Sequence, residues 1–171
     1  MKQIVETEHL FLRELNLNDK DELAAILCDR ESMKYYPNPF DMEQTVNWIK
    51  WNINNYKKYK HGLWAVILKG ENIFLGDCGI TIQEIEGEEI PELGYHLKKE
   101  YWNKGYATEA AKACIEYAIY NLNLEKIYSY TKSDNLPSIR VAEKVGMRFV
   151  KQFKKVIMGI PVNEVLYCIH R

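Results

Sequence analysis

Residues 100–110 read Glu-Tyr-Trp-Asn-Lys-Gly-Tyr-Ala-Thr-Glu-Ala and lead into a segment in which small and apolar side chains recur three and four positions apart. Side chains at that spacing lie on one face of a helix, so the pattern predicts a long helix with one buried face. Residues 91–97, just before the stretch, read as a strand. A turn centred on Gly105 therefore joins a strand to a helix whose buried face comprises Ala107, Ala110, Ala111, Cys114, Ile115, Ala118, Ile119 and Leu122.

The turn from Asn103 to Thr108 has the features of an anion site. Backbone N–H groups at the start of a helix have no intrahelical partners and lie at the positive end of the helix dipole, where they can bind a phosphate or pyrophosphate. Gly105 allows close backbone approach, Ala107 keeps the next position small, and we expect Thr108 to cap the helix. A single glycine before a helix is more often only a turn residue, so these residues alone leave both interpretations open.

The stretch Trp102–Ala110 resembles the acyl-CoA pyrophosphate loop of the GNAT superfamily of N-acetyltransferases. The usual pattern is Arg/Gln-x-x-Gly-x-Gly/Ala, and Trp102 at its first position is characteristic of the Rim-type branch, which acetylates ribosomal-protein N-termini and includes relatives that act on small amines. Residues Asn135–Met147 resemble the second motif of the superfamily in the Asn-x-x-Ser form of that branch.

This resemblance implies an α/β fold in which residues 1–171 form a single acetyltransferase domain. The mixed sheet would have about seven strands, mostly antiparallel with one parallel pair, and four helices would accompany it. The sequence agrees, because a strand at 91–97, the helix, and a strand at 126–131 follow one another. That order predicts a parallel strand pair with a right-handed crossover. We expect the first strand at residues 7–15.

The resemblance also implies acetyl-CoA as co-substrate. The pyrophosphate would be held mainly by backbone N–H groups of Asn103, Lys104, Gly105, Tyr106, Ala107 and Thr108. Tyr95, His96 and Leu97 would run alongside the pantetheine arm, and Asn135 and Ser138 would bind it from the second motif.

Ser138 is the expected acid for the departing thiolate. Many members of the superfamily carry a tyrosine on this helix, but the corresponding residue here is Ala142. Ser138 lies four residues earlier, on the same helix face and one turn nearer the N-terminus. The alternative is a hydroxyl that only satisfies a backbone group in the first turn, which is common for serine.

A base is expected on the strand at 91–97, where alternation places Glu92, Gly94 and His96 on one face. An amine must be neutral to attack a thioester, whereas free α-amines and lysine-type amines titrate near ~8 and ~10. Glu92 is the first candidate because it precedes the Leu-Gly-Tyr segment as in the family, and His96 is the second because of its pKa. Both residues also fit a structural role.

The acceptor side is predicted from a segment rich in aromatic residues between the first two helices. Pro37 and Pro39 interrupt helix there, and Tyr35, Tyr36 and Phe40 favour a packed loop. In the family this region shapes the acceptor site, so the three aromatics, with Trp48 from the next helix, are expected to bind the amine substrate. A plain connector is the alternative.

Composition narrows the remaining possibilities. The 171 residues are 47% hydrophobic and 27% charged with a formal net charge of −1, so we expect neither nucleic-acid nor membrane binding. The four cysteines and four histidines show no metal-ligand spacing, so no metal is expected.

We expect a cytoplasmic monomer or homodimer that transfers an acetyl group to a primary amine on a protein N-terminus or a small molecule. A catalytically silent acyl-CoA sensor and a nucleotide-binding module remain alternatives.

Overall fold

The computed structural model describes residues 3–171, which contain one sheet of eight strands in the order β1-β2-β3-β4-β5-β6-β8-β7. The strands are β1 (Gln3–Glu6), β2 (Leu10–Glu14), β3 (Leu63–Leu68), β4 (Ile73–Ile85), β5 (Glu88–Leu97), β6 (Lys126–Lys132), β7 (Arg148–Ile157) and β8 (Ile160–His170). The helices are α1 (Lys20–Leu27), α2 (Met42–Tyr59), α3 (Tyr106–Tyr120) and α4 (Leu136–Lys144).

The predicted α/β class, the four helices and the parallel pair are confirmed. Only β5 and β6 run parallel among the neighbouring strands of the described sheet, and α3 connects them. The prediction of about seven strands was wrong by one, because β1 was not expected. A strand of four residues with only two apolar side chains gives almost no periodic signal.

The boundary of the first predicted strand also differs. Residues 7–9 form the turn between β1 and β2 rather than the start of a strand. The Thr7 amide donates to the Leu10 carbonyl at 2.9 Å, and the Leu10 amide donates back to the Thr7 hydroxyl at 3.0 Å. This reciprocal pair closes the turn, so the strand begins only at Leu10.

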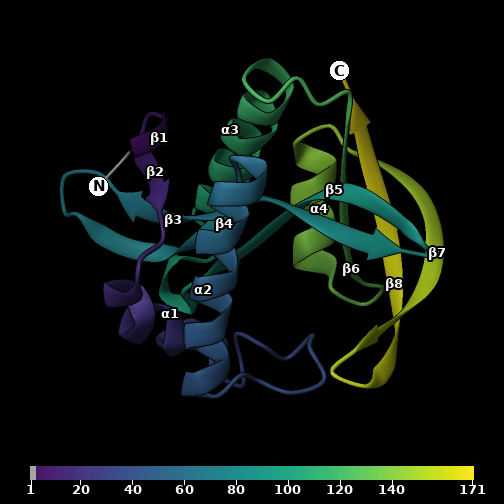
Figure 1. The fold of residues 1–171 in the computed structure, drawn as a ribbon, viewed down its shortest axis with the longest axis horizontal. Coiled ribbons are helices and arrows are strands. Elements are labelled where there is room, and N and C mark those ends of the chain that lie inside the picture. Colours follow the sequence, from purple (N-terminus) through teal and green to yellow (C-terminus); the bar gives the residue numbers. More distant parts are fainter. Residues whose placement is uncertain (1–2) are drawn as a thin grey trace.

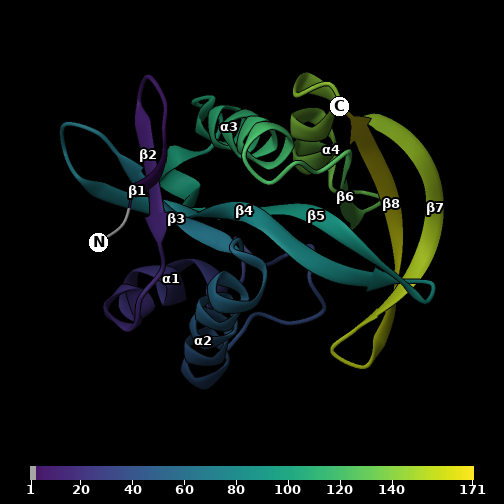
Figure 2. The same ribbon diagram turned by 45° about the horizontal axis from the view of Figure 1, so that its top comes forward.

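Helices cover both faces of the sheet, with α3 and α4 on one side and α1 and α2 on the other (Figure 2). The face toward α3 and α4 packs Leu93 and Leu97 of β5 against the predicted apolar face of α3, including Ala110 and Cys114. A second cluster lies under α1 and α2 and comprises Leu15, Leu23, Ile26, Leu27, Met33, Ile49, Ala65, Ile67 and Phe74.

Helices α1 and α2 cover only part of their face of the sheet. These helices lie near the β2–β4 half of the sheet, whereas the connecting loop, residues 28–41, extends toward the β7–β8 hairpin (Figures 1 and 2). A small third cluster on β4, β5, β7 and β8 comprises Ile85, Ile90, Phe153 and Leu166. No helix within residues 3–171 is long and apolar enough to cross a membrane.

Candidate active site

The parallel strands β5 and β6 separate soon after they meet. β5 pairs with β4 along its whole length, but its ladder with β6 consists of the single pair Glu92↔Tyr128. From Gly94 to Leu97 no strand in the described chain lies against the β6 side of β5. Backbone groups along that edge are therefore available to an extended ligand, except the Leu97 carbonyl, which accepts a hydrogen bond from the Trp102 indole N–H at 2.8 Å.

Residues 98–105 connect the end of β5, beside this opening, to the start of α3. Gly105 is the N-cap residue, with a left-handed φ of 88° and no side-chain cap, so the expected cap by Thr108 is wrong. The first intrahelical bond runs from the Glu109 amide to the Gly105 carbonyl at 3.0 Å, which leaves the N–H groups of Tyr106 to Thr108 without helical acceptors. A Cβ at Gly105 would meet no atom within 4 Å, so the turn is open. The geometry is that of an anion site.

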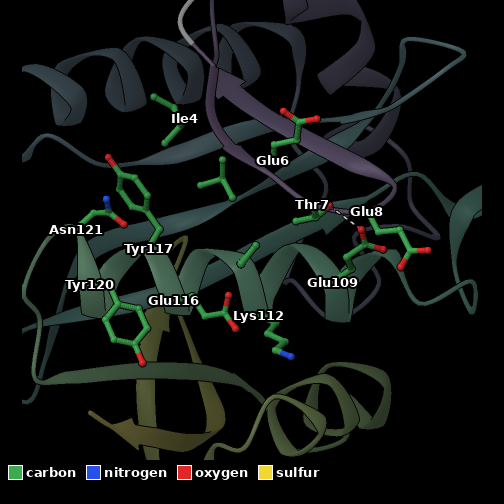
Figure 3. A pocket seen from close by; sticks show the side chains of 12 residues that line it. Ile4, Glu6, Thr7, Glu8, Glu109, Lys112, Glu116, Tyr117, Tyr120 and Asn121 are labelled. Atoms are coloured by element: carbon green, nitrogen blue, oxygen red, sulfur yellow. Dashed lines mark hydrogen bonds between the residues drawn. The ribbon is translucent and has the colours of Figure 1, made fainter.

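The β1–β2 turn holds the first turn of α3 in place. The Glu109 carboxylate accepts hydrogen bonds from the Thr7 hydroxyl at 2.6 Å and the His9 amide at 2.9 Å, and its other oxygen lies 3.0 Å from His9 Nδ1. Burial alone would raise the pKa of Glu109, but these hydrogen bonds lower it below its ordinary value. The contact lies at one end of an open groove of about 610 Å³ between β1 and α3, which none of the predicted site residues lines (Figure 3).

On the α3 and α4 side of β5, the structure brings three predicted residues together. The Tyr95 hydroxyl donates to the Ser138 carbonyl at 3.1 Å, and Asn135 Oδ1 accepts from the Ser138 amide at 3.3 Å. Asn135 is the N-cap residue of α4, and its Nδ2 donates to Thr131 Oγ1 at 2.9 Å. Both ends of the Asn135 amide are thus fixed beside the opening, and burial raises the pKa of Tyr95, which stays a neutral phenol.

On the opposite face, His96 is held between two partners. Its Nδ1 lies 2.8 Å from Asp77 Oδ1 on β4, and its Nε2 lies 2.9 Å from the Tyr36 hydroxyl in the loop 28–41. Trp48 of α2 donates its indole N–H to Asp77 Oδ2 at 3.0 Å. Burial by itself would lower the pKa of His96, but the charge and hydrogen bond of Asp77, with the charge of Glu92, raise it above its ordinary value.

Two of the predicted acceptor aromatics contact His96 and a third packs beside them. The ring centroids of Tyr36 and Trp48 lie 5.7 and 6.0 Å from that of His96, and Phe40 packs edge-on against Trp48 at 5.8 Å. Tyr35 lies apart from this group, with the Lys34 ammonium 5.5 Å from its ring.

Glu92 is buried on the same face as His96, with 8% of its surface exposed. Thr81 Oγ1 donates to Glu92 Oε2 at 3.3 Å. A Cβ placed on Gly94 would lie 3.2 Å from the same oxygen, so the carboxylate extends over Gly94, beside the opening. Burial raises the pKa of Glu92 to about 7, although the Thr81 hydrogen bond and the charge of His96 act in the opposite direction.

Asp77 is a site residue that the sequence pattern did not predict. Its one signal is a lone carboxylate inside the apolar run Ile73–Ile82, and the structure buries it completely. A buried carboxylate needs partners, which Trp48 and His96 supply. Among residues 3–171 no group of three or more His, Cys, Asp or Glu side chains is arranged to hold a metal ion.

Comparison with known proteins agrees with this geometry. Residues 9–148 match the family described as acetyltransferase (GNAT) domain. The chain is 38% identical over 159 residues to the uncharacterized protein YkkB and 34% identical over 153 residues to the uncharacterized N-acetyltransferase YnaD, both of Bacillus subtilis strain 168. The alignments cover 92% of each chain for YkkB, and 90% of this chain and 87% of YnaD.

Solved structures share the fold. A GNAT-family acetyltransferase from Bacillus anthracis superposes with a TM-score of 0.81 at 34% identity over 97% of each chain. RimL, a ribosomal L7/L12 alpha-N-protein acetyltransferase solved with coenzyme A, superposes with a TM-score of 0.80 at 15% identity over 99% of this chain and 98% of its own, which shows a common fold.

The chain belongs to the GNAT family of acetyltransferases. It is accordingly an N-acetyltransferase of the class that uses acetyl-CoA, and its fold is shared with the Rim-type ribosomal-protein acetyltransferases.

Proposed function

We propose that this enzyme acetylates a primary amine, on a protein N-terminus or a small molecule, by direct attack of the amine on the thioester of acetyl-CoA. The observation that carries the proposal is the separation of β5 from β6 beyond Glu92↔Tyr128, next to the open Gly105 turn. An extended acyl-CoA matches this arrangement, with its pyrophosphate at the helix start and its pantetheine arm along residues 95–97.

The co-substrate is held chiefly by backbone groups. The N–H groups of residues 103–108 bind the pyrophosphate, and Asn135 binds the arm from the start of α4. The Lys104 ammonium, 5.0 Å from the Tyr101 ring centroid, adds positive charge at the turn. Backbone donors on the free edge of β5 polarise the thioester carbonyl and stabilise the oxyanion that forms on attack.

Glu92 is the base in this proposal. A carboxylate with a pKa of about 7 is substantially ionised at neutral pH and still basic enough to accept a proton from an ammonium group as it becomes the nucleophile. His96, the second candidate, has both ring nitrogens engaged by Asp77 and Tyr36. We therefore assign His96 to positioning Tyr36 at the acceptor side, together with Phe40 and Trp48.

Ser138 is the proposed acid that protonates the departing thiolate. Its backbone is fixed between Asn135 and Tyr95, and its side chain is only half-buried at the start of α4. All proposed site residues come from one chain, which supports a site that functions in a monomer or in each subunit of a homodimer.

A catalytically silent acyl-CoA sensor is the second candidate. It is favoured by the buried Ala142, which removes the commonest acid of the family from α4. Thermal unfolding with acetyl-CoA and thiol release with a panel of peptides, polyamines and antibiotic amines separate the two. A raised Tm with thiol release supports the enzyme, a raised Tm without turnover supports the sensor, and no effect on Tm contradicts both.

A further inference from the structure

Glu164 of β8 is a buried carboxylate that the proposed acetyl transfer does not use. Only 3% of its surface is exposed, and its Oε2 has no hydrogen-bond partner among the described residues. Its strand neighbours are Lys132 on β6 and Phe153 on β7. A buried oxygen left without a donor costs free energy and calls for an explanation.

Glu164 lies on the acceptor face of the sheet. Alternation along β6 and β8, with the registers Tyr128↔Cys168 and Lys132↔Glu164, puts Glu164 on the same face as Tyr130. The Tyr130 hydroxyl reaches Gln83 of β4 at 3.3 Å across the face that also carries Glu92. Glu164 and Glu92 therefore lie on the same face of the sheet, on β8 and β5, with β6 between them.

Within residues 3–171, neither Glu92 nor Glu164 forms an ion pair within 4.0 Å. The nearby Lys155 instead donates to the Glu84 carbonyl at 2.9 Å, with its ammonium 4.9 Å from the Tyr130 ring centroid. Ionising two buried carboxyls that have no ion-pair partner is unfavourable, and a positively charged group between them would relieve both.

The surroundings of Glu164 favour a cation over a neutral donor. Burial raises the pKa of Glu164 to about 7, while the charges of Lys155 and Lys132 act against that shift and Asp134 adds to it. The carboxyl is therefore poised between its neutral and ionised forms, and an ammonium placed beside Oε2 would select the ionised form by a charge-assisted hydrogen bond.

We propose that Glu164 binds a second ammonium group of the acceptor, so that the enzyme acts on linear diamines or polyamines in preference to monoamines. This inference rests on the proposed function: Glu92 takes the proton of the reacting amine, and Glu164 holds the other end of the molecule. β8 is two strands from β5, so two regular spacings of about 4.8 Å set a separation of at least roughly 10 Å, which the β5–β6 opening widens. Tyr130 and Phe153 supply apolar surface for the chain between the amines.

The test is a kinetic series with purified protein and acetyl-CoA. Linear diaminoalkanes of increasing length are compared with the alkylamine and the amino alcohol of the same length, which lack the second charge. We expect an optimum length at which the diamine is acetylated with the lowest KM. Glu164→Gln should raise that KM by about 10- to 100-fold and leave the KM of the alkylamine and amino alcohol unchanged, because only the diamine loses an ionic partner, while any change in kcat is shared by all three acceptors because the charge of Glu164 also acts on Glu92.

Two further variants complete the design. Glu88→Gln removes an exposed carboxylate of β5 and should leave the diamine KM unchanged. Lys155→Met keeps an apolar stem over Tyr130 but removes the competing ammonium, so it should lower the KM of diamines several-fold and leave that of alkylamines unchanged, which tests the site even if Glu164→Gln does not fold.

Several results would overturn the inference. Equal effects of Glu164→Gln on diamine and alkylamine, or a Lys155→Met variant with an unaltered diamine KM, would show that Glu164 is only a buried neutral acid. A preference for acceptors whose far end is uncharged, or for peptide N-termini without a second cation, would also show that Glu164 is only a buried neutral acid. In all these cases acetyl-CoA still raises Tm and thiol is still released, so the proposed function stands; its own failure is seen when no acceptor releases thiol, whether or not acetyl-CoA raises Tm.

Discussion

The two faces of β5 differ in what they bury. Toward α3 and α4 the strand presents Leu93 and Leu97, which pack into the main apolar core beside Tyr95. Toward α1, α2 and the loop 28–41 it presents Glu92 and His96, both ionisable and largely buried. One face contributes the stability of hydrophobic burial, while the other carries charged groups that oppose folding unless they have partners.

The groups that are available for chemistry therefore lie on the polar face of the sheet. Asp77 and Tyr36 engage both ring nitrogens of His96, and Trp48 donates to Asp77, whereas among the described residues Glu92 has one long hydrogen bond and Glu164 lacks a partner on one oxygen. Groups that are already satisfied hold the site in shape, and groups that are not remain free to exchange protons or bind ligand charges. Substitutions in these two kinds of group should therefore have different effects.

The largest effect is expected from Glu92→Gln. Removal of the base should lower kcat by about 10²–10⁴-fold near neutral pH, because the acceptor amine then remains protonated. The acetyl-CoA-induced rise in Tm should persist, and Glu89→Gln on the same strand should retain full activity. Near-normal kcat in Glu92→Gln, measured by thiol release, would move the role of base to His96 or water.

Ser138→Ala tests the opposite face. We expect kcat to fall by about 10²-fold while the affinity for acetyl-CoA stays nearly unchanged, since thiols titrate near ~8.5 and their departure is assisted by a proton donor. The loss should shrink with a thioester of a more acidic thiol. The control is Ser133→Ala in the exposed β6–α4 loop. Wild-type kcat under conditions where chemistry limits the rate would leave Ser138 as a helix-start hydroxyl only.

The pH dependence of kcat in the wild-type enzyme tests whether Glu92 is the base. Glu92 must be ionised to act as base, and its pKa is raised from its ordinary value to about 7. Below that pH, kcat should therefore fall about tenfold per unit, and above it the rate should level off. A profile that keeps its full rate down to pH near ~5 would exclude a base with this pKa.

A smaller effect is expected from Tyr36→Ala on the loop 28–41. The acceptor KM should rise about tenfold through loss of a pocket wall, and the acetyl-CoA KM should change little because the two ligands meet only at the thioester. Tyr35→Ala is the matched control, since Tyr35 makes its contact with Lys34 instead. Equal changes in both constants for Tyr36→Ala would place the loop outside the acceptor site.

The sequence predicted the α3 side well because its signals are local. The spacing of Ala110, Cys114 and Ala118 and the glycine before the helix each depend on a few neighbouring residues, and both appear where expected. β1 and the start of β2 were misplaced because short strands and their turns are fixed by partners such as Glu109, about a hundred residues away.

The acceptor side could be predicted only in part. Alternation correctly put Glu92 and His96 on one face, but the sequence gave no register between β4 and β5, which is what brings Asp77 opposite His96. Glu164 was likewise hidden, because its burial depends on the pairing of β8 with β6 and β7. Side chains that come from the five strands β4 to β8, helix α2 and the loop 28–41 have no common sequence pattern.

The most direct test of acetyl-CoA binding at the β5–β6 opening compares two glycines with nearly the same positive φ. Gly105 and Gly87 have φ values of 88° and 87°, and an added Cβ would meet no atom within 4 Å at either position. Gly105→Val and Gly87→Val should therefore lower the apo Tm by similar amounts through backbone strain. Acetyl-CoA should raise the Tm of wild type and Gly87→Val but not of Gly105→Val. An undiminished ligand-induced rise in Gly105→Val would contradict the assignment of the pyrophosphate to this turn.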